Sequence, residues 1–443
     1  SWGGMINGLF TLRGAWDRVR KDPVLKFMVV GVTAYGMATF EGPMMSFKNV
    51  NAITHYTDYV ISHVHTAALA WNGGLTFAML YFIVPRIFNT NMYSMKMANF
   101  HFWAATMGMI IYVIPIYWGG IVQSLMWKEF NDAGTLMYPN FMETVTHLIP
   151  MYAARTIGGG LYLVGILVGT FNLYKTMRSG SLVADEKAEA NVEHLAAAEH
   201  KDGTFHRWLE SKPTQFTVLT VVAILIGGVV EYLPTALVKS NVPTIESVKP
   251  YTPLELVGRD IYIAEGCVGC HSQMIRPFRS ETERYGEYSK AGEFVYDRPF
   301  LWGSKRTGPD LHRVGGKYPD SWHYMHFMDS RSTSPGSIMP SYPWFLDRKI
   351  NIDQVPAKIR TLTRLGVPYP DGYDQRAIDD LRRQATTIAS GLQSGGFDVE
   401  WDSHMIAVIA YLQRLGTDIK ADRQAVGTFE KYVGNESMNQ ASN

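Results

Sequence analysis

Long apolar runs fill the first half of the chain, whereas the second half alternates short apolar stretches with turns. An α-helix needs about 20 mainly apolar residues to cross a bilayer. The second run is longer than this, which predicts a tilted helix or an interfacial turn. The runs predict five membrane spans, at Val24–Phe47, Tyr56–Phe88, Asn99–Met126, His147–Met177 and Gln215–Val238.

The order of apolar and polar segments predicts an all-α membrane protein with four units. Residues 1–178 hold four spans, and residues 179–213 form a polar linker on the cytoplasmic side. Residues 214–244 hold a fifth span, which anchors a soluble domain at 245–443. Helical patterns at Leu254–Glu265 and His404–Leu415 bracket this domain. We expect these two helices to pack on each other.

Basic residues mark every second loop. Loops rich in Lys and Arg stay on the cytoplasmic side of a membrane. An odd number of spans then places the C-terminal domain on the opposite side, which in a Gram-negative cell is the periplasm. The sequence thus predicts a multi-pass protein of the bacterial inner membrane. The basic positions are Arg13, Arg18, Arg20 and Lys21, then Arg86 and Lys96, then Lys175 and Arg178, and finally Arg207 and Lys212.

Composition supports this interpretation and removes two classes of protein. Hydrophobic residues make up 47% of the chain and charged residues 18%, against about 25% charged in an ordinary soluble domain. The 41 basic and 40 acidic residues nearly cancel, which argues against a nucleic-acid binder. Aromatic residues at 13% argue against disorder. Membrane lipid is the expected surrounding, and nucleic acid is not an expected partner.

The C-terminal domain contains the sequence Cys267-Val-Gly-Cys270-His271. This spacing is typical of covalent haem c attachment, in which two thiols add to the vinyl groups and the histidine faces the iron. A zinc site is one alternative, but it usually needs about four ligands. A redox dithiol is another, and it would lie near a βαβ pattern. The sequence favours haem c.

A second axial ligand of haem c is expected downstream, because a thioether ligand raises the reduction potential. Met339 is the best candidate, since it lies in a loop rich in Pro and Gly at 334–343. Arg306, beside the segment Gly308-Pro-Asp-Leu311, is a candidate partner for a haem propionate. The competing methionines are Met274, which is close to the attachment site, and Met325, Met328 and Met405, which lie in helical patterns.

The second span contains His63-Val64-His65. Histidines inside membrane spans are costly and are therefore candidates for function. At about 100° per residue, two positions apart on a helix point about 200° apart. The two imidazoles therefore cannot share one metal, but each could bind a different haem. The alternative is a pair of buried histidines that hydrogen-bond to neighbouring helices.

Together these motifs resemble the cbb3-type, or C-type, haem-copper cytochrome c oxidases. The His-Val-His span looks like helix ten of the catalytic subunit. The segment before it, Phe40–Lys48, also resembles this oxidase type. Residues 1–180 look like the last four helices of subunit I, and residues 205–443 look like the mono-haem subunit II. The resemblance implies a respiratory terminal oxidase. In it, electrons pass from haem c through a low-spin haem b to a high-spin haem b and copper, where oxygen is reduced to water with proton translocation.

The resemblance also implies roles for individual residues. His63 would be the proximal ligand of the high-spin haem b, and His65 an axial ligand of the low-spin haem b. Glu41 would bond to the second ring nitrogen of His63, which makes the imidazole more basic. Glu41 and Tyr35 are the candidate catalytic residues, with Tyr35 matching a tyrosine of the proton path. The polar residues expected near the haem propionates are Asn51 and His55.

The chain departs from the family in one respect. The copper ligands and the other low-spin haem ligand belong to earlier helices of subunit I. We therefore expect copper in the complete complex but not bound by this chain. The missing helices come from another polypeptide, or the chain is a truncated or fused gene product. A di-haem cytochrome c subunit and a cytochrome c electron donor are the other expected partners.

Two further functions stay open at this stage. A nitric oxide reductase shares the His-x-His helix and a membrane-anchored haem c partner, although its active metal is iron. The chain could also be a non-catalytic electron-transfer fragment that lacks the oxygen site.

Overall fold

The computed structural model describes residues 2–182, 205–238 and 241–420. These residues form helices joined by loops, and no strand occurs among them, so the all-α prediction is confirmed. The chain divides into two compact units: residues 1–182 together with 246–443, and residues 183–245. The predicted linker at 179–213 lies partly outside the described residues, because the description omits 183–204.

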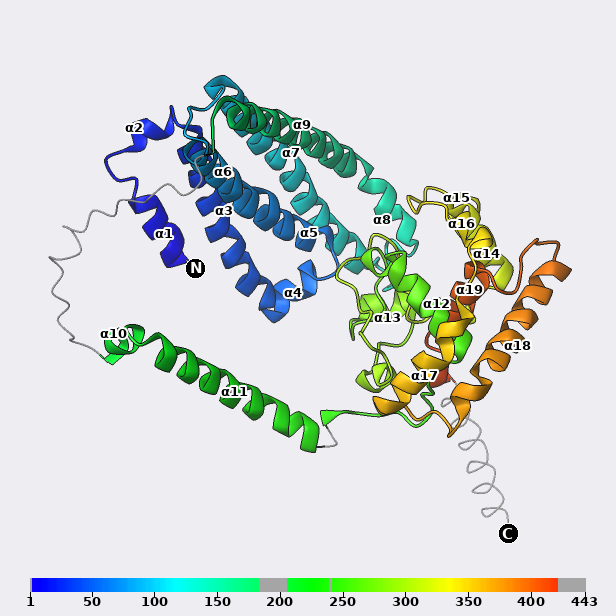
Figure 1. Cartoon of the computed structure of the whole chain (residues 1–443). Helices are drawn as coiled ribbons and strands as arrows, with labels where there is room; N and C mark the ends of the chain where they lie inside the picture. The colour runs from blue at the N-terminus through cyan, green and yellow to red at the C-terminus, as the bar shows by residue number, and fades with distance from the viewer. Residues whose placement is uncertain (1, 183–204, 239–240, 421–443) are drawn as a thin grey trace, which may run out of the picture. The chain divides into compact units, whose positions relative to one another are not determined.

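The described residues contain five helices long and apolar enough to cross a membrane, as the hydropathy predicts. Short helices precede or connect them: α1 (Trp2–Phe10), α2 (Trp16–Val19), α4 (Lys48–Thr54), α8 (Phe141–His147) and α10 (Phe205–Glu210). Figure 1 labels the five long helices: α3 (Pro23–Ser46), the continuous pair α5 and α6 (Asp58–Ile87), α7 (Met95–Lys128), α9 (Ile149–Ser179) and α11 (Pro213–Leu237).

The second span is one continuous helix with a change of hydrogen-bond register in its middle. Helix α5 runs over Asp58–His65, a π-helical segment follows at Thr66–Asn72, and α6 runs over Gly73–Ile87. A π-helix closes i→i+5 bonds and fits more residues into each turn than an α-helix. The register change begins directly after His65, which places it beside the predicted haem ligands.

Helices α7 and α9 lie side by side (Figure 1), and glycines allow this close approach. A Cβ atom added at Gly108 would lie 2.6 Å from the backbone nitrogen of Tyr162, and one at Gly158 would lie 2.5 Å from that of Tyr112. Real Cβ atoms do not come this near to backbone. Of the run Gly158–Gly160, the first residue therefore makes the close approach, whereas Gly160 faces open space.

The C-terminal domain is built around α12 (Pro253–Ala264) and α19 (His404–Arg414), which pack against each other as predicted. Thr252 caps α12 in a capping box with Glu255, which satisfies two free backbone donors at the helix start. The core between these helices is fully buried. The remaining helices of this domain are α13 (Arg279–Tyr285), α14 (Asp320–Met328), α15 (Ser330–Thr333), α16 (Trp344–Asp347), α17 (Val355–Arg364) and α18 (Tyr373–Ser394).

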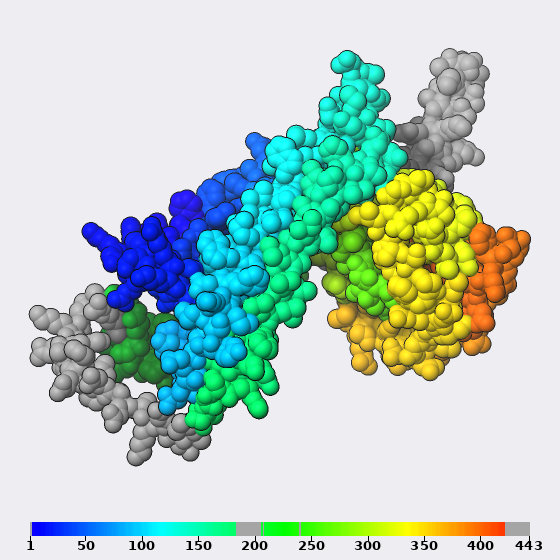
Figure 2. All heavy atoms as spheres, turned by 90° about the horizontal axis from the view of Figure 1, so that it is seen from above, coloured from blue at the N-terminus to red at the C-terminus, as the bar shows by residue number. Residues whose placement is uncertain are grey.

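Within the first unit, the C-terminal domain contacts the ends of the membrane helices. Arg284 donates to the backbone oxygens of Tyr138 and Pro139, at 2.7 and 2.9 Å, in the loop before α8. A Cβ at Gly336 would lie 3.0 Å from Thr146 of α8. In Figure 2 the yellow part of the domain, which includes this loop, lies beside the end of α8 and the start of α9. The loop that carries Met339 is therefore near the membrane helices.

Candidate functional site

The two cysteines and His271 lie in a tight turn that follows α12. Gly266, at φ 73°, ends the helix in the left-handed region that favours glycine. A 3₁₀ turn at Cys267–Gly269 follows, and the backbone nitrogens of Cys270 and His271 both donate to the oxygen of Cys267, at 3.1 and 2.9 Å. Both thiols are free of disulfides, with Cys267 partly buried and Cys270 exposed. The turn leaves both available for covalent attachment.

His271 is held in an orientation and tautomer that suit a metal ligand. Its Nδ1 donates to the backbone oxygen of Pro309 at 2.8 Å, so Nε2 keeps its lone pair. Burial lowers the pKa of His271, which favours the neutral form that metals bind. Gly308 lies against the imidazole, where a Cβ would collide with the ring. Gly308 and Pro309 belong to the segment beside Arg306, the candidate partner of a haem propionate.

Met339 lies in the loop where the sequence predicts the second axial ligand. Its backbone nitrogen donates to Oγ of Ser337 at 3.2 Å, and its oxygen accepts from Oγ of Ser330 at 2.8 Å. Its side chain packs on the same hydrophobic cluster as that of Cys267. The competing Met405 is fully buried inside α19. The assignment of Met339 stays a prediction, which this placement supports.

Arg306 is 1% exposed and paired within the protein. Its Nε donates to Oγ of Ser272 at 2.7 Å, and its Nη2 donates to Oε2 of Glu281 at 3.0 Å. Burial opposes its charge, but Tyr285, Glu281 and Asp310 raise the pKa of Arg306, so it stays a cation. These bonds fix its guanidinium beside the residue that follows His271. Its predicted pairing with a haem propionate stays a prediction.

His63 and Glu41 form the contact that the family resemblance implies. Nδ1 of His63 lies 3.1 Å from Oε2 of Glu41, which extends from α3. The same oxygen accepts a hydrogen bond from the hydroxyl of Tyr117 on α7, at 2.5 Å. That hydroxyl also lies 3.3 Å from Oγ1 of Thr66. Sequence reasoning did not find Tyr117, because its partner is 76 positions away and no local motif marks it.

His65 has a different set of neighbours. Its Nδ1 donates to the backbone oxygen of Ile61 at 2.7 Å. Its ring stacks on Tyr112 of α7, with 4.8 Å between centroids and 30° between planes. Arg155 of α9 donates to the hydroxyl of Tyr112 at 2.9 Å. As at His63, an acceptor engages Nδ1, which leaves Nε2 free to ligate a metal. Both histidines therefore fit a haem ligand.

The other predicted residues fall into two places. The ring of Tyr35 packs on Trp71 in the π-helical segment, with 4.8 Å between centroids. Asn51 and His55 lie where the membrane helices meet the C-terminal domain: the backbone oxygen of Asn51 accepts from Arg276 at 3.5 Å. Burial, assisted by Arg276 and Arg306, lowers the pKa of His55 to about 4, so this side chain is neutral at pH 7.

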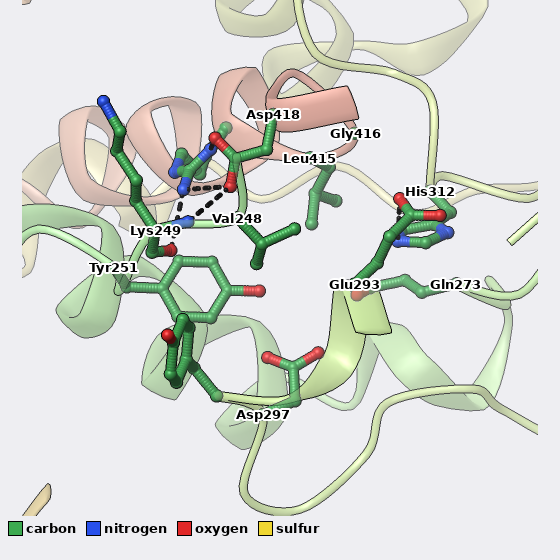
Figure 3. Close-up of a pocket in the computed structure, with 12 residues that line it drawn as sticks. Val248, Lys249, Tyr251, Gln273, Glu293, Asp297, His312, Leu415, Gly416 and Asp418 are labelled. Atoms are coloured by element: carbon green, nitrogen blue, oxygen red, sulfur yellow. Dashed lines mark hydrogen bonds and ion pairs between the residues drawn. The ribbon is translucent and has the colours of Figure 1, made fainter. Parts of the chain in front are cut away.

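A separate pocket in the C-terminal domain lies between the end of α19 and the segment that precedes α12 (Figure 3). Arg414 pairs there with Asp418 at 2.5 Å and donates to the backbone oxygen of Lys249 at 2.9 Å. Glu293 pairs with Arg313 at 2.8 Å. Among the described residues that line this pocket, none is a predicted haem ligand. Its charges stabilise the fold by pairing with one another.

Comparison with known protein families gives one match for each half of the chain. Residues 1–161 match the family described as cytochrome c and quinol oxidase polypeptide I, and residues 206–419 match the mono-haem subunit of cytochrome c oxidase, FixO. The two halves of the chain thus match two families of cytochrome c oxidase subunits. The predicted resemblance to a cbb3-type oxidase, with a mono-haem subunit fused to part of subunit I, is confirmed. The descriptions of both oxidase families imply haem cofactors.

The first half of the chain has relatives of high sequence identity. It is 52% identical over 181 residues to a cytochrome c oxidase subunit 1 homologue of the bacteroid from Bradyrhizobium diazoefficiens, covering 41% of this chain and 33% of the relative. It is 49% identical over 200 residues to cytochrome c oxidase subunit 1 of Rhodobacter capsulatus, covering 45% and 36%. It is 47% identical over 180 residues to the cbb3-type cytochrome c oxidase subunit CcoN1 of Stutzerimonas stutzeri, covering 40% and 38%. The chain spans about a third of the length of these relatives.

Proposed function

We propose that the chain is a component of a cbb3-type terminal oxidase in the bacterial inner membrane, with its C-terminal domain in the periplasm. The bound haems carry electrons from haem c, through a low-spin haem b, to a high-spin haem b and copper, where oxygen is reduced to water and protons are translocated. The remaining helices of subunit I, which supply the copper ligands, and a di-haem cytochrome c subunit complete the complex. A cytochrome c supplies the electrons.

One observation carries this proposal: three histidines at the predicted iron sites each engage Nδ1 with an acceptor. His271 bonds to Pro309, His63 to Glu41, and His65 to Ile61. Fixing Nδ1 in this way orients the ring and leaves Nε2 for the iron. The sequence motifs mark these three positions independently of their hydrogen bonds. The same arrangement at all three positions therefore favours haem ligation.

The residues of the chain have separate tasks in this proposal. Cys267 and Cys270 hold haem c covalently, and His271 and Met339 ligate its iron. His63 and His65 hold the high-spin and low-spin haems b. Glu41 makes His63 more basic, and the carboxylate is held by Tyr117. Tyr35, Asn51 and His55 serve proton movement and the propionates, and Arg306 positions the segment after His271.

Metal analysis of the purified complex that contains this chain tests the oxidase function. We expect haem b, haem c and copper, and oxygen uptake when a reduced cytochrome c is supplied. Non-haem iron in place of copper, with reduction of nitric oxide, would instead establish the nitric oxide reductase alternative. Haem without either metal, and without oxygen uptake, would show that the chain only transfers electrons.

Tyr117→Phe removes one donor from the carboxylate of Glu41. Glu41 then accepts only from His63, so it pulls harder on the Nδ1 proton and strengthens the iron–imidazole bond. We expect a higher iron–histidine stretching frequency of the high-spin haem by resonance Raman spectroscopy. Glu41→Gln should lower the same frequency, and activity losses for such partners are about 10- to 100-fold. An unchanged frequency in Tyr117→Phe would contradict the proposed role of this hydroxyl.

A further inference from the structure

Tyr56 lies where the membrane helices meet the C-terminal domain. It stands between the end of α4 at Thr54 and the start of α5 at Asp58, and its side chain is fully buried. Its φ of 69° lies in the left-handed region, which residues with a side chain rarely adopt. Such a conformation persists where surrounding contacts fix it. The contacts of Tyr56 therefore identify what holds it there.

Residues 302–306 of the C-terminal domain hold Tyr56 at both ends. The backbone nitrogen of Arg306 donates to the backbone oxygen of Tyr56 at 2.8 Å. The hydroxyl of Tyr56 donates to the backbone oxygen of Trp302 at 3.1 Å. Tyr56 also forms an isolated parallel bridge with Lys305. One tyrosine thus bonds to the C-terminal domain through its main chain and through the tip of its side chain.

The ring of Tyr56 is covered by charged and aromatic groups. The guanidinium carbons of Arg306 and Arg276 lie 4.3 and 5.3 Å from its centroid. Cation–π contacts of this kind gain strength when they are shielded from water. The imidazole of His55 stacks on the ring at 4.0 Å, with 15° between the planes. Both domains therefore contribute to the same stack.

This stack reaches toward the predicted iron sites on both sides. Nε of Arg306 donates to Oγ of Ser272, which follows His271 in the chain. On the other side, Tyr56 directly precedes α5, the helix that carries His63 and His65. A short chain of contacts thus links the haem c segment to the helix of the b haems.

We propose that Tyr56 is a positioning residue: it fixes the C-terminal domain on the membrane helices and so sets the rate of electron transfer between haem c and the b haems. This inference rests on the proposed function, because it needs haems at both ends. Electron transfer between two cofactors slows steeply as the distance between them grows. The C-terminal domain stays joined to the membrane helices by the chain itself, so a loosened contact changes distance and orientation without losing the domain.

The test uses the complete complex in which this chain carries Tyr56→Leu. Carbon monoxide is flashed off the partly reduced complex, and the absorbance of haem c is followed as electrons redistribute. We expect electron transfer to slow severalfold, because the rate of electron tunnelling falls exponentially as the distance between the haems grows. The spectra and midpoint potentials of all haems should stay as in the wild type. Tyr56→Phe, which keeps the ring, should stay near the wild-type rate.

Tyr288→Leu is the matched control, because Tyr288 is an exposed tyrosine of the same domain. If Tyr56→Leu does not assemble, Tyr56→Met, whose longer unbranched side chain adapts to the same space without a ring, gives the same expectation. A wild-type rate in an assembled ring-free variant would overturn the proposal. So would a shifted potential of haem c that accounts for the slower rate, since Tyr56 would then tune the haem. Absence of haem from the wild-type chain would refute the proposed function instead.

Discussion

Replacing Cys267 and Cys270 by serine should remove all haem that stays on this chain in denaturing electrophoresis with peroxidase staining. The two thiols provide the covalent bonds, and serine hydroxyls do not add to vinyl groups. The turn after α12 does not depend on the sulfurs, since its hydrogen bonds are made by backbone atoms of Cys267, Cys270 and His271. The double variant should therefore keep its local fold and lose only the attachment.

Met339→Ala provides the matched control for this experiment. It alters a proposed iron ligand but leaves both thioether bonds, so peroxidase staining should remain. Its oxidised spectrum should lose the charge-transfer band of a methionine–iron bond near the red end. Staining that survives in the double cysteine variant would show that haem is not attached at this motif.

His63→Ala and His65→Ala should each remove a different b haem from the complete complex. His65→Ala should abolish the low-spin b spectrum and keep the carbon monoxide difference signal of the high-spin site, and His63→Ala should do the reverse. The reason is helix geometry: side chains two positions apart point about 200° apart around the axis, so they cannot ligate one iron. The neighbours differ accordingly: His63 meets Glu41, whereas His65 stacks on Tyr112.

His147→Ala is the control for these two variants. His147 is an exposed histidine at the end of α8, so both b spectra should survive its replacement. Loss of the same haem in His63→Ala and His65→Ala would refute the assignment of two haems to one helix. It would also remove the proposed electron route along α5.

The sequence predicts the membrane spans well because hydropathy acts over whole helices, and span length is fixed by bilayer thickness. It also predicts where haem c would be attached, because that chemistry depends on the spacing of Cys267, Cys270 and His271 along the chain. The sequence does not single out Tyr117 or Tyr56, because each acts through a partner far away in the sequence. The pairing of Arg306 with Glu281 inside the protein was missed for the same reason.

The register of the second span was also beyond sequence reasoning. Hydropathy reports that residues 56–88 are apolar enough to cross the membrane, but it does not report which carbonyl each amide bonds to. The π-helical segment at Thr66–Asn72 depends on packing against α3, α7 and α9. Such packing is a property of the folded bundle, not of the local sequence.

That π-helical segment has a consequence for which mutations this span can accept. Deleting one residue between Thr66 and Asn72 would let an uninterrupted α-helix continue from α5 into α6. The π-helical turns hold the additional residue, so the side chains of α6 would keep nearly the direction they have now. Gly74 now touches the backbone of Phe27 and Gly31, where a Cβ would lie 3.2 and 3.3 Å away. After the deletion Gly74 would still face that surface, and the side chains that move would be those of the π-helical segment, including Trp71, which packs on Tyr35.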